Sequence, residues 1–187
     1  MTGPAGDVLV YNVARLLTEA PGSSRTVRVA GVMLNLGADI ELADPLEGDV
    51  RIARTNRGVL VTGRLTTSLS ESCSRCLRSI EVPIDIALEE EVLPSIDIVT
   101  GLPVDESVEP DVARLTDHHE LDLEPLLREA ILLAEPIAPL CRPDCPGLCV
   151  VCGEDLSVGD HAHDEAPIDP RLEALRAFRR DDEAENR

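Results

Sequence analysis

This chain has no lysine and almost no aromatic residues. Its 187 residues include no tryptophan, one phenylalanine (Phe178) and one tyrosine (Tyr11), whereas proteins that hold single-stranded nucleic acids usually stack bases on aromatic side chains. All 17 basic residues are arginines, and 36 acidic residues bring the net charge to -19. Because such a charge repels phosphates, the composition argues against bulk attachment to nucleic acid and leaves room only for local contacts.

Long apolar runs and recognisable catalytic motifs are also missing from the sequence. No run approaches the roughly 20 apolar residues that span a bilayer, and the first basic residue is Arg15, which does not fit a signal peptide. We therefore expect a cytoplasmic protein with no membrane association. The sequence has no glycine-rich phosphate loop, Ser-His-Asp arrangement or paired-carboxylate motif, so we expect neither an enzyme nor a small-molecule substrate.

Alternating apolar and polar residues predict an α+β protein whose core is an antiparallel β-sheet with few helices. The clearest strands are 59–69 and 80–89, in which every second residue is mostly Val, Leu or Ile. Shorter strands are expected at 8–13, between 27 and 42, and around 50–52. Because a short segment joins the two long strands, we expect a β-hairpin there.

Composition shifts divide the chain into two parts. Residues 1–135 form a β-rich domain with a long acidic loop at 93–121 and one helix, which we expect to begin at Asp122 and to end before a proline. Residues 136–180 form a cysteine-rich, zinc ribbon-like C-terminal module with a short helix, and residues 181–187 are predicted to be a disordered tail.

Six cysteines carry the strongest chemical signal. Thiols stay reduced in the cytosol, so cysteines in a chain without a secretion signal are better interpreted as metal ligands than as disulfides. The Cys-x-x-Cys spacing lets one tight turn direct two sulfurs at the same tetrahedral ion. The expected ligands are Cys73, Cys76, Cys141, Cys145, Cys149 and Cys152. The first pair falls at the tip of the predicted hairpin and must recruit ligands from a distant segment.

The spacing leaves one or two zinc ions open. In the two-ion scheme, Cys73, Cys76, Cys141 and Cys145 hold one ion, and Cys149 and Cys152 hold another with His161 and His163. In the one-ion scheme, the two Cys-x-x-Cys pairs share an ion and the middle two cysteines stay free or auxiliary. Buried free cysteines or redox-active dithiols are the remaining alternatives.

Basic residues gather around the cysteines despite the acidic total. These residues are candidates for a local RNA or partner contact: Arg75, Arg78, Arg142, Arg171 and Arg176. The competing explanation is that they balance the charge of about -2 on a zinc tetrathiolate centre and solvate a helix face.

Several of these segments together resemble one known family. They are Cys73-Ser-Arg-Cys76-Leu, Glu135-Pro136-Ile137, the cysteine-rich run from Cys141 to Leu156, and Ile168-Asp169-Pro170-Arg171-Leu172. This set is similar to the YceD family of large ribosomal RNA subunit accumulation proteins, over residues of about 8 to 179.

The resemblance implies a non-catalytic role in accumulation of large-subunit rRNA and in ribosome biogenesis. The expected partner is a ribosomal protein or an rRNA assembly intermediate of the large subunit. Two alternatives are a switch based on zinc and thiol oxidation, and a zinc-dependent RNA-processing hydrolase that would use the short His161-Ala-His163-Asp164 motif.

Overall fold

The main sheet of the protein is antiparallel. The structure, a computed structural model, describes residues 9–37, 40–105, 107, 109–159, 162–163 and 171–172. Four strands run in the order β2 (Ser24–Val32), β4 (Leu46–Arg54), β5 (Val59–Ser72) and β6 (Ser79–Val92). The short β3 (Glu41–Leu42) pairs with the end of β5 beyond the last residue that β4 contacts, and thereby extends the sheet toward the hairpin tip.

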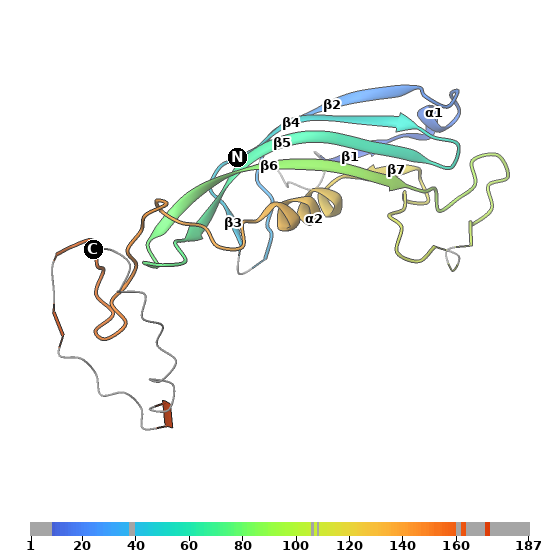
Figure 1. Cartoon of the computed structure of the whole chain (residues 1–187). Coiled ribbons are helices and arrows are strands. Elements are labelled where there is room, and N and C mark those ends of the chain that lie inside the picture. Colours follow the sequence, from blue (N-terminus) through green and yellow to red (C-terminus); the bar gives the residue numbers. More distant parts are fainter. Residues whose placement is uncertain are drawn as a thin grey trace, which may run out of the picture.

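The β5–β6 hairpin is the longest element of the sheet. Both strands have 14 residues and stay in register from Val59↔Val92 to Ser72↔Ser79. Period-two alternation explains this register, because a slip by one residue would move every apolar side chain to the solvent face. The hairpin therefore carries its turn well beyond the rest of the sheet (Figure 1).

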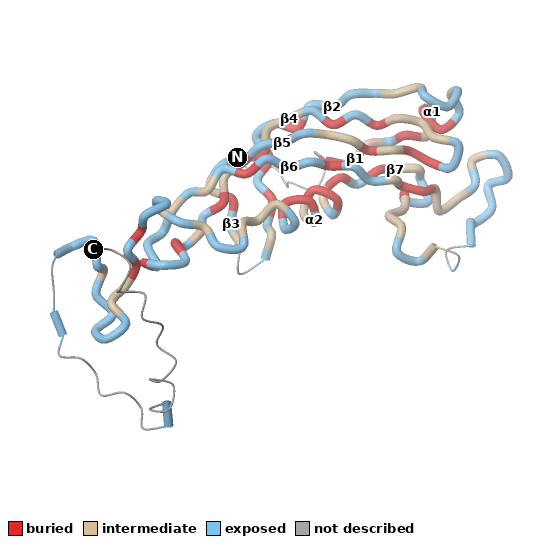
Figure 2. The backbone as a smooth tube through the Cα atoms, in the orientation of Figure 1, coloured by how far each residue is buried: buried red, intermediate tan, exposed pale blue. Residues whose placement is uncertain are grey.

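A small second layer covers one face of the sheet. It consists of the paired strands β1 (Val10–Asn12) and β7 (Glu120–Asp122) and of the helices α1 (Ala14–Leu17) and α2 (Glu124–Ala134). Helix α2 packs chiefly against β6 (Figure 1). The core between the layers is aliphatic, and buried positions recur along the strands and along α2 (Figure 2). Its most buried members include Leu46, Val50, Val59, Val61, Leu69, Leu123, Leu127 and Ile131.

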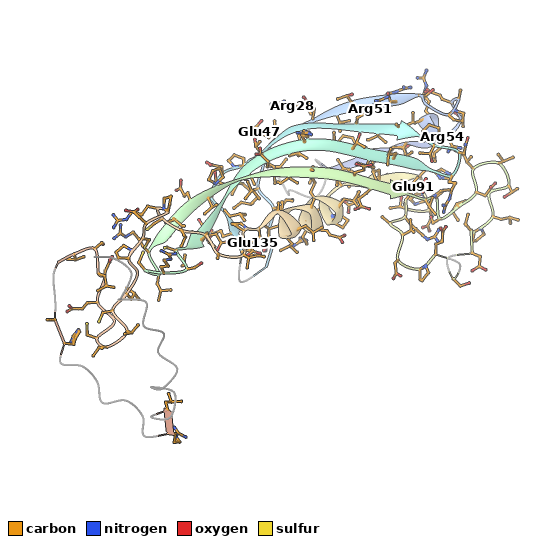
Figure 3. The ribbon with its side chains drawn as sticks, viewed as in Figure 1. Arg28, Glu47, Arg51, Arg54, Glu91 and Glu135 are labelled. Carbon is orange, nitrogen blue, oxygen red and sulfur yellow. The ribbon has the colours of Figure 1, made fainter. Side chains whose placement is uncertain are left out.

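The opposite face of the sheet is polar, and its charge changes from one edge to the other. On this face β2 carries Arg28 and no acidic residue, whereas β6 carries four acidic residues and no basic one: Glu81, Asp85, Glu89 and Glu91. Arg28, Glu47 and Arg51 lie on this outer face (Figure 3). Arg28 pairs there with Glu47 and Asp49 across the neighbouring strand, at 3.3 and 3.4 Å. The net acidity of the chain is therefore not spread evenly over the sheet.

Most of the predicted elements are present, with local differences. The sheet and the two helices are consistent with an α+β protein, and the long hairpin is confirmed. Helix α2 begins at Glu124 instead of Asp122, whose carboxylate accepts the Glu124 amide at 2.9 Å. The expected strand after Val32 is wrong: Leu34 is buried, but residues 33–37 pair with no strand in the described part of the chain. The short elements α1 and β7 were not predicted, and β7 begins within the last two residues of the predicted 93–121 loop.

Within the described part of the chain, no helix is both long enough and apolar enough to cross a membrane.

Gly48 provides a test of the tight packing between β4 and β5. A Cβ atom at this position would lie 2.4 Å from the Arg64 carbonyl oxygen and 2.8 Å from the Leu65 Cα. Because both contacts are with backbone, Gly48→Ala should lower the free energy of unfolding by about 1–3 kcal/mol. Urea denaturation measures this, with Gly159→Ala as control, since a Cβ at Gly159 meets nothing within 4 Å. Equal midpoints for the two variants would contradict the prediction.

Candidate metal centre

The turn between β5 and β6 orients the first cysteine pair. The Cys73 amide donates to the Arg78 carbonyl at 2.8 Å, and the Leu77 amide donates to the Cys73 carbonyl at 2.9 Å. Leu77 adopts a φ of 58°, a left-handed conformation that is uncommon for a branched side chain. This conformation closes the turn within a few residues and leaves the Cys73 and Cys76 side chains buried.

The segment after α2 returns to this turn and binds it through backbone groups. The Ser74 amide donates to the Pro139 carbonyl at 2.9 Å, and the Leu148 amide donates to the Arg75 carbonyl at 3.2 Å. The Arg75 guanidinium donates to the Cys145 carbonyl at 2.9 Å. Gly147 has a φ of 82°, and a Cβ there would lie 3.2 Å from the Arg75 carbonyl oxygen, so glycine suits both the backbone and the close approach.

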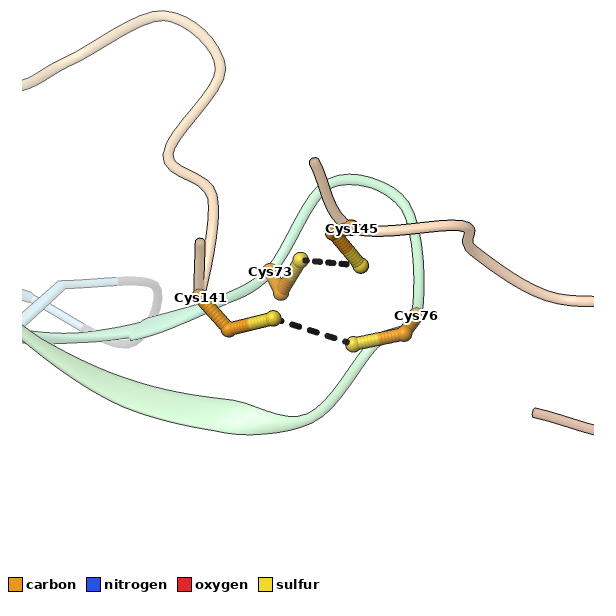
Figure 4. A group of neighbouring side chains, drawn as sticks. All are labelled: Cys73, Cys76, Cys141 and Cys145. Atoms are coloured by element: carbon orange, nitrogen blue, oxygen red, sulfur yellow. Dashed lines mark hydrogen bonds between the residues drawn. The ribbon is translucent and has the colours of Figure 1, made fainter. Parts of the chain in front are cut away.

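Four sulfur atoms from these two segments face one another (Figure 4). The Sγ atoms of Cys73 and Cys145 are 3.8 Å apart, as are those of Cys76 and Cys141. All four sulfurs lie within 4.8 Å of one another. A tetrahedral zinc ion with Zn–S bonds of about 2.3 Å requires sulfurs about 3.8 Å apart, whereas a disulfide requires about 2.05 Å. The spacing therefore fits a metal ion, and no disulfide joins these cysteines.

A second group lies further along the chain and is more exposed. Ligand atoms of Cys149, Cys152 and His163 come within 4.8 Å of one another. The Gly153 amide donates to the Cys149 carbonyl at 2.8 Å with a φ of 75° at Gly153, and the Val151 amide donates to the Cys149 sulfur at 3.4 Å. Amide donors to sulfur are typical of thiolate ligands. His161, the other expected ligand of this group, lies outside the described residues.

This grouping corresponds to the two-ion scheme of the sequence analysis. The structure places Cys141 and Cys145 beside the hairpin tip and groups Cys149 and Cys152 with His163. The one-ion scheme would require the two Cys-x-x-Cys pairs to meet, and the structure does not bring them into one cluster.

The thiols of the first group differ in acidity. Backbone amides of Cys141, Cys76 and Arg75 surround the Cys73 sulfur and lower its pKa to about 6, so Cys73 carries negative charge at neutral pH. Burial, together with hydrogen bonds to the neighbouring sulfurs, raises the pKa of Cys141 to about 12. A cation between the sulfurs would let Cys141 lose its proton as well, because the cation stabilises all four thiolates at once.

Two of the candidate arginines form contacts that hold the segments of this region together. Arg75 donates to the Cys145 carbonyl, and Arg78 binds Asp155 at 2.9 Å, which joins the hairpin tip to the second cysteine loop. Arg142 pairs with Asp144 at 3.5 Å, and Arg171 is exposed. Arg176 lies outside the described residues. A contact of these arginines with RNA or a protein partner remains a prediction.

Sequence reasoning missed two positions that support the site. Asp155 has no spacing signal that would pair it with Arg78, which lies 77 residues earlier. Gly147 could have been found, because glycine after proline in Cys145-Pro-Gly-Leu suggests a turn with positive φ.

The sheet thus forms a platform whose longest hairpin ends in a cluster of four thiols that could hold a metal ion. The family model described as large ribosomal RNA subunit accumulation protein YceD matches residues 61–179, and the chain belongs to this family. The matched range contains both cysteine groups, together with β6 and α2.

Relatives occur in mycobacteria and in Bacillus. The chain is 40% identical over 132 residues to the uncharacterized protein Rv2926c of Mycobacterium tuberculosis, covering 70% of this chain and 60% of the relative. It is 33% identical over 132 residues to an uncharacterized protein of Mycobacterium leprae, covering 70% of this chain and 58% of the relative. The chain therefore matches less than two thirds of the length of these mycobacterial proteins.

A more distant relative is matched over more of its length. The uncharacterized protein YlbN of Bacillus subtilis is 23% identical over 154 residues, which covers 81% of this chain and 85% of that protein. No solved structure matches the chain.

Metal affinity of the first group should depend on pH. Because the Cys141 thiol has a pKa of about 12, it is protonated at neutral pH and must release its proton to bind a cation. Affinity should therefore rise by about tenfold per pH unit for each such proton. The Cys73 thiol, with a pKa of about 6, becomes protonated only below that pH, so it makes metal affinity more strongly dependent on pH only there. Competition with a chelator between about pH 5 and 8 measures the slope, and affinity independent of pH would contradict this prediction.

Proposed function

We propose that the chain is a non-catalytic, zinc-stapled factor that supports accumulation of large-subunit rRNA during ribosome assembly. The observation that carries the proposal is the tetrathiol cluster, whose 3.8 Å sulfur spacings fit a tetrahedral zinc ion. The chain belongs to the YceD family, and the family's description, large ribosomal RNA subunit accumulation protein, indicates the cellular process. The cluster indicates that the metal would have a structural role in this process.

The first zinc ion would fasten the C-terminal module, residues 136–180, to the tip of the sheet. Cys76 and Cys141 are separated by 65 residues, and closing a loop of this length costs conformational entropy. Few backbone hydrogen bonds hold the two segments together, so the bonds to the ion are expected to provide much of the stability of this junction. A second ion, held by Cys149, Cys152 and His163 with His161 as the fourth ligand, would order the following loop.

The partner we propose is a basic component of the large subunit, a ribosomal protein alone or within an rRNA intermediate. The outer face of β6 offers it four acidic residues and no basic one: Glu81, Asp85, Glu89 and Glu91. Glu81, Asp85 and Glu89 are exposed there. Charges of one sign along a strand raise the rate of encounter with an oppositely charged partner and disfavour partners of the same sign.

Control by oxidation is a second candidate function, favoured by the sulfur geometry. The sulfurs form two pairs at 3.8 Å, one between Cys73 and Cys145 and one between Cys76 and Cys141. Peroxide could convert each pair of thiolates to a disulfide, with peroxide reduced to water and the zinc ion released. The C-terminal module would then be held by covalent bonds in a different geometry. Zinc content and free thiols before and after peroxide treatment separate this candidate from a purely structural ion.

Replacing Cys73 should remove the first ion and loosen the module. We expect purified wild-type protein to carry two zinc ions and Cys73→Ser to carry one, because three thiolates leave a position open to water. Arg78 is exposed at the hairpin tip, is followed by Ser79 and binds Asp155 of the module, so trypsin should cleave after Arg78 faster in the variant. Native mass spectrometry and limited proteolysis measure both effects.

Ser74→Ala is the matched control, since Ser74 is exposed in the same turn and contacts Pro139 through its backbone amide alone. Wild-type protein that is properly folded and free of metal when purified without chelators would refute the zinc staple. Unchanged proteolysis in Cys73→Ser would refute its structural role.

Neutralising β6 should weaken capture of large-subunit components. In the test variant, three exposed acids of this face are replaced: Glu81→Gln, Asp85→Asn and Glu89→Gln. The control variant replaces three acids of the 93–121 loop: Asp105→Asn, Asp111→Asn and Asp117→Asn. Pull-down with identification of proteins and RNA should show a loss in the first variant only. Recovery of neither large-subunit proteins nor their rRNA by wild-type protein, with normal rRNA levels in a depleted strain, would contradict the proposed function.

A further inference from the structure

A groove lies between the small second layer and the β2 edge of the main sheet. It has a volume of about 370 Å³, within the range of about 300–1,000 Å³ that is typical of small-ligand sites. Tyr11 of β1 and Leu16 of α1 line one side of it, and Val27 and Ile52 of the sheet line the other. The wall is therefore mainly apolar and contains the chain's one tyrosine, in a protein that has no tryptophan.

Two arginines stand among the residues that line this groove. The side chain of Arg15 is 91% exposed and that of Arg25 is 51% exposed, so both guanidinium groups reach solvent. Glu19 pairs with both of them, at 3.8 Å with Arg15 and more closely with Arg25. One carboxylate against two guanidinium groups leaves an excess positive charge beside an aromatic ring.

The position of the groove within the charge pattern of the sheet also matters. It borders β2, the strand with two arginines and no acidic residue, and the strongly acidic β6 lies at the opposite edge. Arg28 of β2 is paired with Glu47 and Asp49, so the positive charge available at the groove comes from Arg15 and Arg25. An anionic ligand with a flat apolar part matches both the charge and the lining of the groove.

We propose that this groove binds one unpaired nucleotide of single-stranded RNA. Its base would lie against Tyr11 and the neighbouring aliphatic side chains, and its phosphates would contact Arg15 and Arg25. Aromatic stacking of bases and arginine contacts with phosphate are the usual means of holding unpaired RNA. A single such site satisfies the restriction to local contacts that the net charge imposes. The inference rests on the proposed function in one respect, because that function makes rRNA the natural source of the nucleotide.

The chain carries its own reporter for this site. Tyr11 is the one tyrosine and no tryptophan is present, so ultraviolet fluorescence of the protein comes chiefly from the groove. Addition of a ten-residue oligouridylate or oligoadenylate to the full, zinc-loaded chain should quench this emission in a saturable way, after correction for absorbance by the RNA. Fluorescence anisotropy of the same oligonucleotides, labelled at one end, gives the dissociation constant.

Variants locate the binding in the groove. Tyr11→Leu keeps an apolar side chain without the ring and should weaken RNA binding by about 5- to 150-fold. Arg15→Gln, in a largely exposed side chain that should not affect folding, should weaken binding and lower the salt dependence by about one counterion. Arg64→Gln is the matched control, because Arg64 is an exposed arginine on the outer face of β5 and does not line the groove.

Three outcomes would overturn the inference. They are the absence of RNA binding, an equal loss in Arg15→Gln and Arg64→Gln, and quenching of Tyr11 by a polyarginine peptide but not by RNA, which would indicate a protein ligand. None of these results alters zinc content or the capture of large-subunit components through β6. Failure of this inference is therefore distinguishable from failure of the proposed function.

Discussion

The meeting of four sulfur atoms at the end of a long hairpin is the constraint on which the C-terminal part of the molecule depends. Cys73 and Cys76 reach this point because β5 and β6 stay in register over their full length. Cys141 and Cys145 reach it because α2 packs along β6 and returns the chain toward the tip. Each step is driven by burial of aliphatic side chains, and the last step brings together groups that repel one another as thiolates. The cation that we propose would relieve this repulsion.

The sequence predicts the elements that have a regular period and a strong local signal. Alternation in β5 and β6 located the hairpin, and the Cys-x-x-Cys spacing at 73–76 placed a ligand pair at its tip. The partners of that pair could not be decided from spacing, because the choice depends on the direction in which α2 leads the chain. Leu34 shows another limit: its alternation is that of a strand, but hydrogen-bond partners are a property of the whole sheet. The groove beside Tyr11 likewise depends on how β1 and α1 pack against β2 and β4.

The two Cys-x-x-Cys turns use the same hydrogen bond with different residues. Gly153 and Leu77 each donate their amide to the carbonyl of the first cysteine of the turn, and both have positive φ. Glycine adopts this conformation without steric cost, whereas leucine is held in it at a cost of order 1–3 kcal/mol. The hairpin tip tolerates leucine because strand register, the Arg75 contacts and the sulfur cluster all fix the same backbone path. The second turn has fewer contacts that fix its backbone, and its residue with positive φ is Gly153.

The uneven charge of the sheet has a consequence for how the molecule approaches its partners. With arginines on β2 and acids on β6, the sheet has an electric dipole moment that lies across the strands. A polyanion such as an exposed RNA strand exerts a torque on this dipole before contact and turns the β2 edge toward itself. The acidic edge then points away, toward solvent or toward a cationic protein bound nearby. One rigid sheet can in this way set the relative orientation of two components whose charges are opposite.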